Sequence, residues 1–508
     1  MNKLLTPLFF LFLTSGLYAQ KYTSQITSQE SEKWWQAEQN SGGSVLDLEK
    51  THKSNITTNL DSNYTSFLVS NKGRYIWSRQ PFSYKINENG LIIIDSNLES
   101  LDALSVGKSL REAFLIATNN HFRPSATLPA NNLITNPQYV ISDEILHELS
   151  QDEVLHYANN IIKSGFPAGT LIIDYSWQKH FGNFEIRADR FSDPKLMIDK
   201  LHEQGFSVVL TVFPFVSPDS PEYRNLSAKG YLLKDGDTDK TMLIEWYNGY
   251  SSCLDLTNPK AVDYLNSKLT QLKADYGVDG FIFEDDKYRT TWEIGLKSSS
   301  QLLNAENFTW EGLAGVIPKA FESGFAGRNY FNAGLINTAL ENTSEQTELE
   351  REDQNIDQML TVRAAQMQAM MPTMQFSIAT WSGLDEKHLG YCRDAVKLRE
   401  KIAPYILELS KEVAENGAPI IRHLDYEFPG KGFANCEDQF MLGNKYLVVP
   451  VTSKDNTKKV RLPNGKWIDD KGVEYNGPLV FSVNVEDGRL LYFEHLSNSK
   501  FKLPFKKK

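Results

Sequence analysis

The feature that most constrains the fold is a long region in which short apolar, β-branched segments alternate with amphipathic helical segments. Strands that alternate with helices at this spacing are typical of a parallel sheet. Because residues 131–426 show this pattern, we predict an α/β fold with a (β/α)8 TIM-type barrel over that range. The clearest strand-like segments are 169–174, 207–212 and 280–284, each preceded by a helix-like segment, at 152–163, 195–204 and 260–275.

The barrel region is flanked on both sides by turn-rich sequence with short strand-like runs. Before it, such runs occur at 64–69, 82–86 and 91–94; after it, they occur at 445–451, 459–462, 479–483 and 489–493. Short alternating strands between Asn, Gly and Ser residues favour β-sandwich architecture. We therefore predict an N-terminal β-sandwich domain at 20–130 and a C-terminal β domain of the same class at 427–508.

The first nineteen residues resemble a secretory signal peptide. Lys3 precedes an apolar run at 4–13, and small residues lead to Ala19. This run is shorter than the roughly 18 apolar residues that a membrane-spanning helix needs, and the small residue fits a cleavage site. A membrane anchor is the alternative left open. We expect cleavage near Ala19, no membrane span, and an exported protein that is periplasmic or secreted.

Composition excludes several classes of partner and cofactor. The 508-residue chain has 53 basic and 64 acidic residues, a net charge of −11, so no nucleic acid partner is expected. Its three cysteines, Cys253, Cys392 and Cys436, are too few and too scattered for a disulfide framework or a zinc site. We expect no metal and no cofactor, and the sequence leaves the oligomeric state open.

Acidic residues follow one of the predicted barrel strands. In the segment 280–284 the period of two places Phe281 and Phe283 on one face, so that Glu284 shares the other face with Ile282. If the phenylalanines pack against helices, Glu284 points to the mouth of the barrel, where barrel enzymes place their chemistry. Glu284, Asp285 and Asp286 together are compatible with a catalytic carboxylate, an exposed acidic turn, or a Ca²⁺ site.

A series of motifs, in order along the chain, resembles glycoside hydrolase family 31, the family of α-glucosidases and α-galactosidases, and within it the group of the myogenesis-regulating glycosidase. The resemblance covers about residues 136–494. Each motif alone is weak, but their order along the chain is specific. The motifs are LIIDYSW at 171–177, FSDPK at 191–195, WYNG at 246–249, LDLTNP at 254–259, YGVDGFIF at 276–283, WEGL at 310–313, MPTMQFS at 371–377, DQFMLG at 438–443 and LPNGKW at 462–467.

The resemblance implies retaining hydrolysis, in which a nucleophilic carboxylate and an acid/base carboxylate lie about 5–5.5 Å apart. Glu284 stands where the family has its nucleophilic Asp, with Asp285 one residue further on. Glu306 matches the acid/base position if one residue is deleted, whereas an ungapped match puts Ala305 there. Glu306 follows Glu284 by only 22 residues, so one barrel unit is expected to be missing or altered. In addition, the segment 328–335 lacks the acid with which the family's next strand usually ends.

The resemblance also implies sugar-binding residues. Asp174 and Trp177 match the positions that bind the terminal sugar, where Asp accepts hydrogen bonds and Trp stacks on the ring. A turn cap and a core tryptophan are the alternatives. Trp246 and Asn248 are expected in a loop over the barrel mouth. Gln375 is expected on the last strand, either lining the site or as a buried amide whose hydrogen bonds go to the backbone.

We therefore expect an exported α-glycosidase that acts on a carbohydrate substrate, a terminal α-galactoside or α-glucoside, without cofactor. The competing hypothesis is a catalytically inactive relative that binds carbohydrate or serves as an interaction scaffold. The two hypotheses differ in whether the residues at the altered catalytic positions still support hydrolysis.

Overall fold

The centre of the computed structural model is a parallel sheet with the order β15-β14-β10-β9-β8-β16. The last strand in sequence, β16, pairs with the first, β8, which is the pairing that closes a barrel, and Ile336 adds a parallel bridge to Phe376 in β16. The barrel prediction is thus confirmed. The strands are β8 (Gln138–Ile141), β9 (Thr170–Ile173), β10 (Ser207–Val212), β14 (Gly280–Phe283), β15 (Leu296–Lys297) and β16 (Gln375–Phe376).

The structure describes residues 22–36, 66–78, 82, 84–86, 90–96, 100–124, 126, 128–141, 149–235, 239–246, 249–283, 296–297, 308–330, 332–334, 336, 357–377 and 383–496. Within these ranges, no helix is long and apolar enough to cross a membrane.

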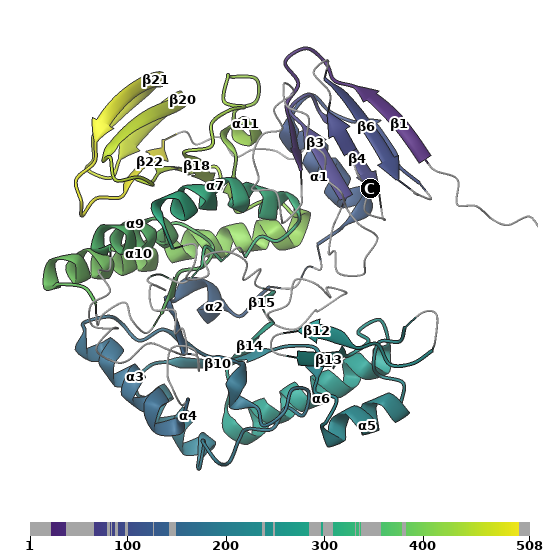
Figure 1. The fold of residues 1–508 in the computed structure, drawn as a ribbon. Coiled ribbons are helices and arrows are strands. Elements are labelled where there is room, and N and C mark those ends of the chain that lie inside the picture. Colours follow the sequence, from purple (N-terminus) through teal and green to yellow (C-terminus); the bar gives the residue numbers. More distant parts are fainter. Residues whose placement is uncertain are drawn as a thin grey trace, which may run out of the picture.

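Helices cover the parallel sheet in two groups. Figure 1 shows α3, α4 and α6 on one side, and α7, α9 and α10 on the other. Short polar residues cap these helices: Ser150, for example, accepts a hydrogen bond from the backbone N–H of Glu153 in α3. The bounds are α2 (Asn131–Thr135), α3 (Gln151–Lys163), α4 (Pro194–Glu203), α5 (Pro221–Ala228), α6 (Pro259–Tyr276), α7 (Trp310–Phe325), α9 (Gln358–Ala369) and α10 (Glu386–Asn416).

Two antiparallel sheets, β1-β6-β5 and β2-β3-β4-β7, form the N-terminal region. Alternation along β3 divides its side chains: Leu68 joins the core between the two sheets, while Phe67 and Val69 pack with Phe114 of α1 in the main core. The elements are β1 (Tyr22–Thr27), β2 (Trp34–Gln36), β3 (Ser66–Ser70), β4 (Arg74–Ser78), β5 (Tyr84–Ile86), β6 (Leu91–Ser96), β7 (Asp102–Ser105) and α1 (Leu110–His121).

The C-terminal region is a six-stranded antiparallel sheet with the order β17-β18-β19-β22-β20-β21. Its own core gathers around Trp467, while Phe440 and Leu442 face the main core. In Figure 1 the sheet lies beyond α9 and α10, away from the barrel strands. The elements are β17 (Ile421–Arg422), α11 (Leu424–Glu427), β18 (Phe440–Leu442), β19 (Tyr446–Val449), β20 (Thr457–Asp469), β21 (Glu474–Asn484) and β22 (Leu491–His495).

A small sheet, β11-β13-β12, follows the third barrel strand. Its members are β11 (Phe215–Val216), β12 (Ile244–Trp246) and β13 (Gly249–Cys253). Because β11 begins three residues after β10 ends and pairs with β13, the β12–β13 hairpin is held at the carboxyl ends of the barrel strands (Figure 1). This is the end of the barrel at which enzymes of this architecture place their active sites.

Candidate active site at the carboxyl ends of the barrel strands

Strand β14 brings the chain to the mouth of the barrel. Phe281 faces the helical layer, because the Lys273 amine of α6 lies 5.7 Å from the centre of its ring. Ile282, one residue on, is fully buried and belongs to the opposite, inner face. The expected outward orientation is therefore confirmed for Phe281. The predicted catalytic residues Glu284, Asp285 and Glu306 lie outside the described residues, and their roles stay predictions.

Asp174 lies directly after β9, at the same end of the barrel. Its backbone N–H donates to the Ile141 carbonyl over 2.9 Å, which continues the ladder between β9 and β8. Its Oδ1 accepts a hydrogen bond from the Tyr175 backbone N–H at 2.7 Å and caps the short helix η1 (Tyr175–Trp177). The structure thus gives Asp174 the turn-cap role named above and places it half-buried at the mouth. Sugar binding by this residue stays a prediction.

Trp177 is a core residue in this structure, which corrects its predicted stacking role. Only 1% of its surface is exposed, and its indole N–H donates to the Thr211 carbonyl of β10 over 2.9 Å. A ring that stacks on sugar needs an exposed face, and here protein covers both faces. Trp177 instead anchors the turn after β9 to the neighbouring strand.

An aromatic cluster at the mouth was not found from the sequence. Tyr175 packs edge-on against Phe213 with 5.6 Å between ring centres, and Phe213 stacks on Phe215 at 6.2 Å. These rings form a core of their own with the side chain of Cys253. The sequence did contain one signal that could have identified this cluster: Phe213 and Tyr175 each lie within two residues of the end of a barrel strand.

Of the predicted loop residues, Trp246 belongs to the β12–β13 hairpin. The backbone of Trp246 ends β12 and pairs with Gly249, while Asn248 lies outside the described residues. Tyr250 on β13 is 65% exposed and was not singled out from the sequence. The hairpin therefore lies at the predicted end of the barrel, and sugar contacts by Trp246 and Asn248 stay predictions.

Gln375 lies at the opposite end of the barrel, which corrects its predicted place in the site. It pairs with Gln138 at the first position of β8, whereas Asp174 follows the last position of β9. Its side chain is buried; it donates to the Gln138 Oε1 at 2.6 Å and accepts from the Asn332 amide. Gln375 is thus buried, as in the alternative, but its amide bonds the side chains of Gln138 and Asn332 and not the backbone. The amino-terminal end of a barrel serves stability.

The start of α7 is fixed at the motif that resembles the family's WEGL sequence. Thr309 caps the helix by accepting from the Gly312 backbone N–H, and the Trp310 indole N–H donates to the Asp357 carboxylate over 2.7 Å. Asp357 itself caps α9. The two helices that follow the predicted acid/base segment thus begin at a common point.

Metal binding finds no support in the part of the chain that the structure describes. There, no group of three or more His, Cys, Asp or Glu side chains is arranged to hold an ion. The acidic run at 284–286 lies outside that part, so the Ca²⁺ alternative is not tested.

Comparisons with known proteins agree with this architecture. Residues 139–305 match the model of the glycosyl hydrolases family 31 TIM-barrel domain, and residues 417–494 match that of the family's C-terminal domain. The mouse myogenesis-regulating glycosidase is 26% identical over 411 residues, covering 72% of this chain and 57% of its own length. An α-xylosidase from Lactiplantibacillus pentosus is 32% identical over 138 residues, which cover 26% of this chain and 18% of that protein.

Among solved structures, a family 31 dextranase from Flavobacterium johnsoniae, in complex with isomaltotriose, superposes with a TM-score of 0.76. The match covers 94% of this chain and 66% of the dextranase chain. At 18% identity the likeness concerns the fold. This chain therefore spans less than two thirds of the length of the mouse protein and of the dextranase chain.

Proposed function

The chain belongs to glycoside hydrolase family 31, and from this premise we propose that it is an α-glycosidase that hydrolyses terminal α-linked sugars. The observation that carries the proposal is the course of β14. This strand ends at Phe283 at the mouth of the barrel, and the next residue in the sequence is Glu284. Asp174 follows the end of β9 at the same mouth.

The proposed mechanism uses two carboxylates. Glu284 attacks the anomeric carbon as the leaving oxygen takes a proton from Glu306, so that a covalent glycosyl-enzyme forms and the aglycone departs. Glu306, now ionised, takes a proton from water, and the resulting hydroxide equivalent displaces Glu284 with a second inversion. Asp285 is the alternative nucleophile. The sugar product keeps the α configuration, and every step is completed without a cofactor.

The substrate proposal is a terminal α-galactoside or α-glucoside. The names of similar proteins include an α-glucosidase from Saccharolobus solfataricus, 38% identical over 94 residues, and the α-xylosidase named above. An α-xyloside therefore belongs in the test panel. A xylose unit differs from a glucose unit only in lacking the C6 hydroxymethyl group, so a pocket that accepts both α-xylosides and α-glucosides makes few contacts to that group.

The test is a panel of chromogenic α-glucosides, α-galactosides and α-xylosides, with the initial anomer read by proton NMR. Turnover with release of the α-anomer supports the retaining mechanism, and release of the β-anomer rejects it. Glu284→Gln is the control that separates turnover by this chain from a contaminating enzyme, since it removes the proposed nucleophile and keeps the side-chain size.

The second candidate is a catalytically inactive relative that binds carbohydrate. Glu284 and Glu306 are close together in the sequence, and this favours the inactive relative because a barrel unit is expected between them. Among the described residues, only the two-residue strand β15 lies between β14 and the start of α7. Saturable binding of a panel sugar without release of product would select this candidate over the enzyme.

We also propose export, because residues 1–19 combine a positive start, a short apolar run and a terminal small residue. Expression of the full chain in a bacterium, followed by N-terminal sequencing of the product, tests it. The proposal expects a chain that begins at Gln20 in the periplasm or the medium. A chain retaining residues 1–19 in the cytoplasm rejects it.

A further inference from the structure

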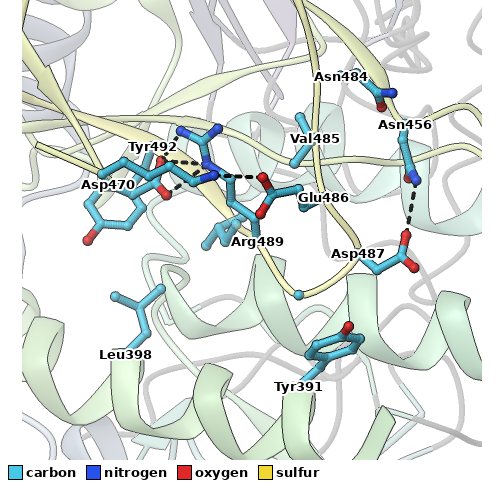
Figure 2. A pocket seen from close by; sticks show the side chains of 13 residues that line it. Tyr391, Leu398, Asn456, Asp470, Asn484, Val485, Glu486, Asp487, Arg489 and Tyr492 are labelled. Carbon is cyan, nitrogen blue, oxygen red and sulfur yellow. Dashed lines mark hydrogen bonds and ion pairs between the residues drawn. The ribbon is translucent and has the colours of Figure 1, made fainter. Parts of the chain in front are cut away.

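A hollow of about 780 Å³ lies between α10 and the loop that joins β21 to β22, away from the barrel mouth. Figure 2 shows Tyr391 and Leu398 on the helix and the loop residues opposite them. This volume falls within the range of pockets that hold small ligands. The lining residues are Tyr391, Leu398, Asn456, Asp470, Lys471, Asn484, Val485, Glu486, Asp487, Gly488, Arg489, Leu490 and Tyr492.

The loop wall of the hollow is fixed from below by α9. The buried guanidinium of Arg363 donates to the backbone carbonyls of Val485, Glu486 and Arg489 at 3.0–3.3 Å. Gln366, one helical turn on, donates to the Asp487 carbonyl at 2.9 Å. Because four of its backbone carbonyls are hydrogen-bonded to α9, this loop is already ordered. Ligand binding would therefore lose little conformational entropy in the loop.

The ionised side chains of the lining already have partners. Arg489 makes a two-pronged contact to Asp470, with both bonds at 2.8 Å, and Lys471 donates to Glu486 at 2.8 Å. Asp487 accepts from the Asn456 amide at 3.1 Å. Figure 2 draws these contacts as dashed lines. Two ion pairs, Arg489–Asp470 and Lys471–Glu486, therefore neutralise four of the five ionised side chains in the lining. The fifth, Asp487, has its ion pair outside the lining, with Lys387 at 3.9 Å.

Neutral hydrogen-bonding groups remain available in the lining. Among the described residues, the Tyr391 and Tyr492 hydroxyls and the Asn484 side-chain amide make no hydrogen bond. Each of these groups both donates and accepts. Leu398 and Leu490 add apolar surface beside them. Uncharged groups that donate and accept, next to small apolar patches, match the hydroxyls and C–H faces of a sugar.

We propose that this hollow is a second, non-catalytic site for a neutral oligosaccharide. The choice of ligand class rests on the proposed function, in which the chain meets α-linked oligosaccharides, and the place of the site rests on the hollow alone. The site would hold a longer substrate to the protein while its terminal unit occupies the barrel mouth, which raises the local concentration of chain ends.

The test uses a reporter that responds at the hollow only. Ser482 is exposed on β21, two residues before Asn484 and therefore on the same side of the strand. The three native cysteines are buried, and burial raises the pKa of Cys392 and of Cys436 to about 12. An environment-sensitive fluorophore therefore labels Ser482→Cys selectively. Maltotriose and isomaltotriose are then titrated, with inorganic phosphate as the charged probe.

The proposal expects a saturable signal with at least one trisaccharide and none with phosphate. Adding Tyr391→Phe and Tyr492→Phe together should weaken that binding about tenfold or more, because two hydroxyl hydrogen bonds are lost. Tyr405→Phe is the matched control: Tyr405 lies on the same helix, its hydroxyl bonds Asn444, and it is outside the hollow. Thermal melting of each variant verifies that it is folded.

The absence of a saturable signal, a response to phosphate alone, or unchanged affinity in the double Phe variant would overturn the site. Hydrolysis of the chromogenic panel by the same labelled protein is read separately. A trisaccharide signal without hydrolysis would therefore reject the proposed enzyme activity and support the second site. Hydrolysis without a trisaccharide signal would support the enzyme activity and reject the second site.

Discussion

The side-chain amide of Gln375 donates to the side-chain oxygen of Gln138 over 2.6 Å, and this bond joins the last barrel strand to the first. Asn332 donates to the other side of the Gln375 amide. All three residues are buried. The bond lies at the amino-terminal end of the strands, opposite Asp174, so the amide network belongs to the closure of the barrel and not to the proposed sugar site.

Gln375→Leu should therefore lower stability and leave sugar affinity unchanged. The substitution leaves the Asn332 amide and the Gln138 oxygen buried without their partner, at a cost of about 2–4 kcal/mol in the free energy of unfolding. Denaturant unfolding measures this cost. Gln271→Leu is the control, because Gln271 is exposed on α6 and its loss should cost less than about 0.5 kcal/mol. If Gln375→Leu raises KM and leaves the free energy of unfolding unchanged, Gln375 contributes to substrate binding and not to stability.

Trp177→Ala should mainly lower the stability of the fold, whereas Asp174→Ala should mainly weaken sugar binding. Removing the buried Trp177 ring should cost about 3–5 kcal/mol in unfolding free energy, because it leaves a cavity and an unpaired Thr211 carbonyl. Asp174→Ala removes a cap on a three-residue helix, so it should cost about 1 kcal/mol and mainly weaken sugar binding. Melting temperatures and binding isotherms of both variants measure the contrast. If Trp177→Ala keeps the parental melting temperature, the ring is not a core residue.

Glu284→Gln should abolish turnover, whereas Asp285→Asn should cost far less. The alternation predicted for 280–284 puts position 284 on the face of Ile282, and the substitution removes the proposed nucleophile, so kcat should fall by about 10³-fold or more with sugar binding intact. Asp285→Asn is the matched control one residue on. Steady-state kinetics on the preferred chromogenic substrate compare the two, and the reverse order of effects would make Asp285 the nucleophile.

The two proposed catalytic carboxyls should also meet in space. In a crystal structure with a bound sugar, the carboxyls of Glu284 and Glu306 should lie within about 7 Å of each other. A separation of more than about 12 Å, with no other acid facing Glu284, would rule out the retaining mechanism and favour the inactive relative.

Acid should weaken the fold through His423. Its Nδ1 accepts from the Asp425 backbone N–H at 3.0 Å, and its ring packs edge-on against Trp35 and Phe321. Burial lowers the pKa of His423 to about 3, so the folded protein keeps the ring neutral while the unfolded chain protonates it below about 6.5. The stabilising contribution is therefore complete above pH 6.5 and is lost as the pH falls toward 3.

Between pH 7 and pH 5 this loss should reach about 2 kcal/mol in unfolding free energy. His423→Asn keeps an acceptor for the Asp425 N–H and does not titrate, so its stability should fall less over the same range. His156→Asn on the exposed face of α3 is the control and should behave like the parent. Parallel pH dependences for parent and His423→Asn would show that another group carries the acid sensitivity.

The sequence by itself determined the barrel, because the alternation of strand-like and helix-like segments is a local property. The runs at 169–174 and 207–212 became β9 and β10, and the residues that follow their ends lie at the mouth of the barrel. The alternation in 280–283 likewise fixed which side of β14 faces the helices. These inferences need only the period of a strand and the rule that parallel strands end together.

Tertiary structure alone decided which polar and aromatic residues are buried. Trp177 and Gln375 lie in motifs that resemble sugar-binding segments, yet one is fixed by the Thr211 carbonyl and the other by Gln138, partners 34 and 237 residues away in the chain. The hollow beside Tyr391 likewise combines α10 with a loop of the C-terminal sheet. Such contacts depend on how separate elements pack, and no local pattern in the sequence records that packing.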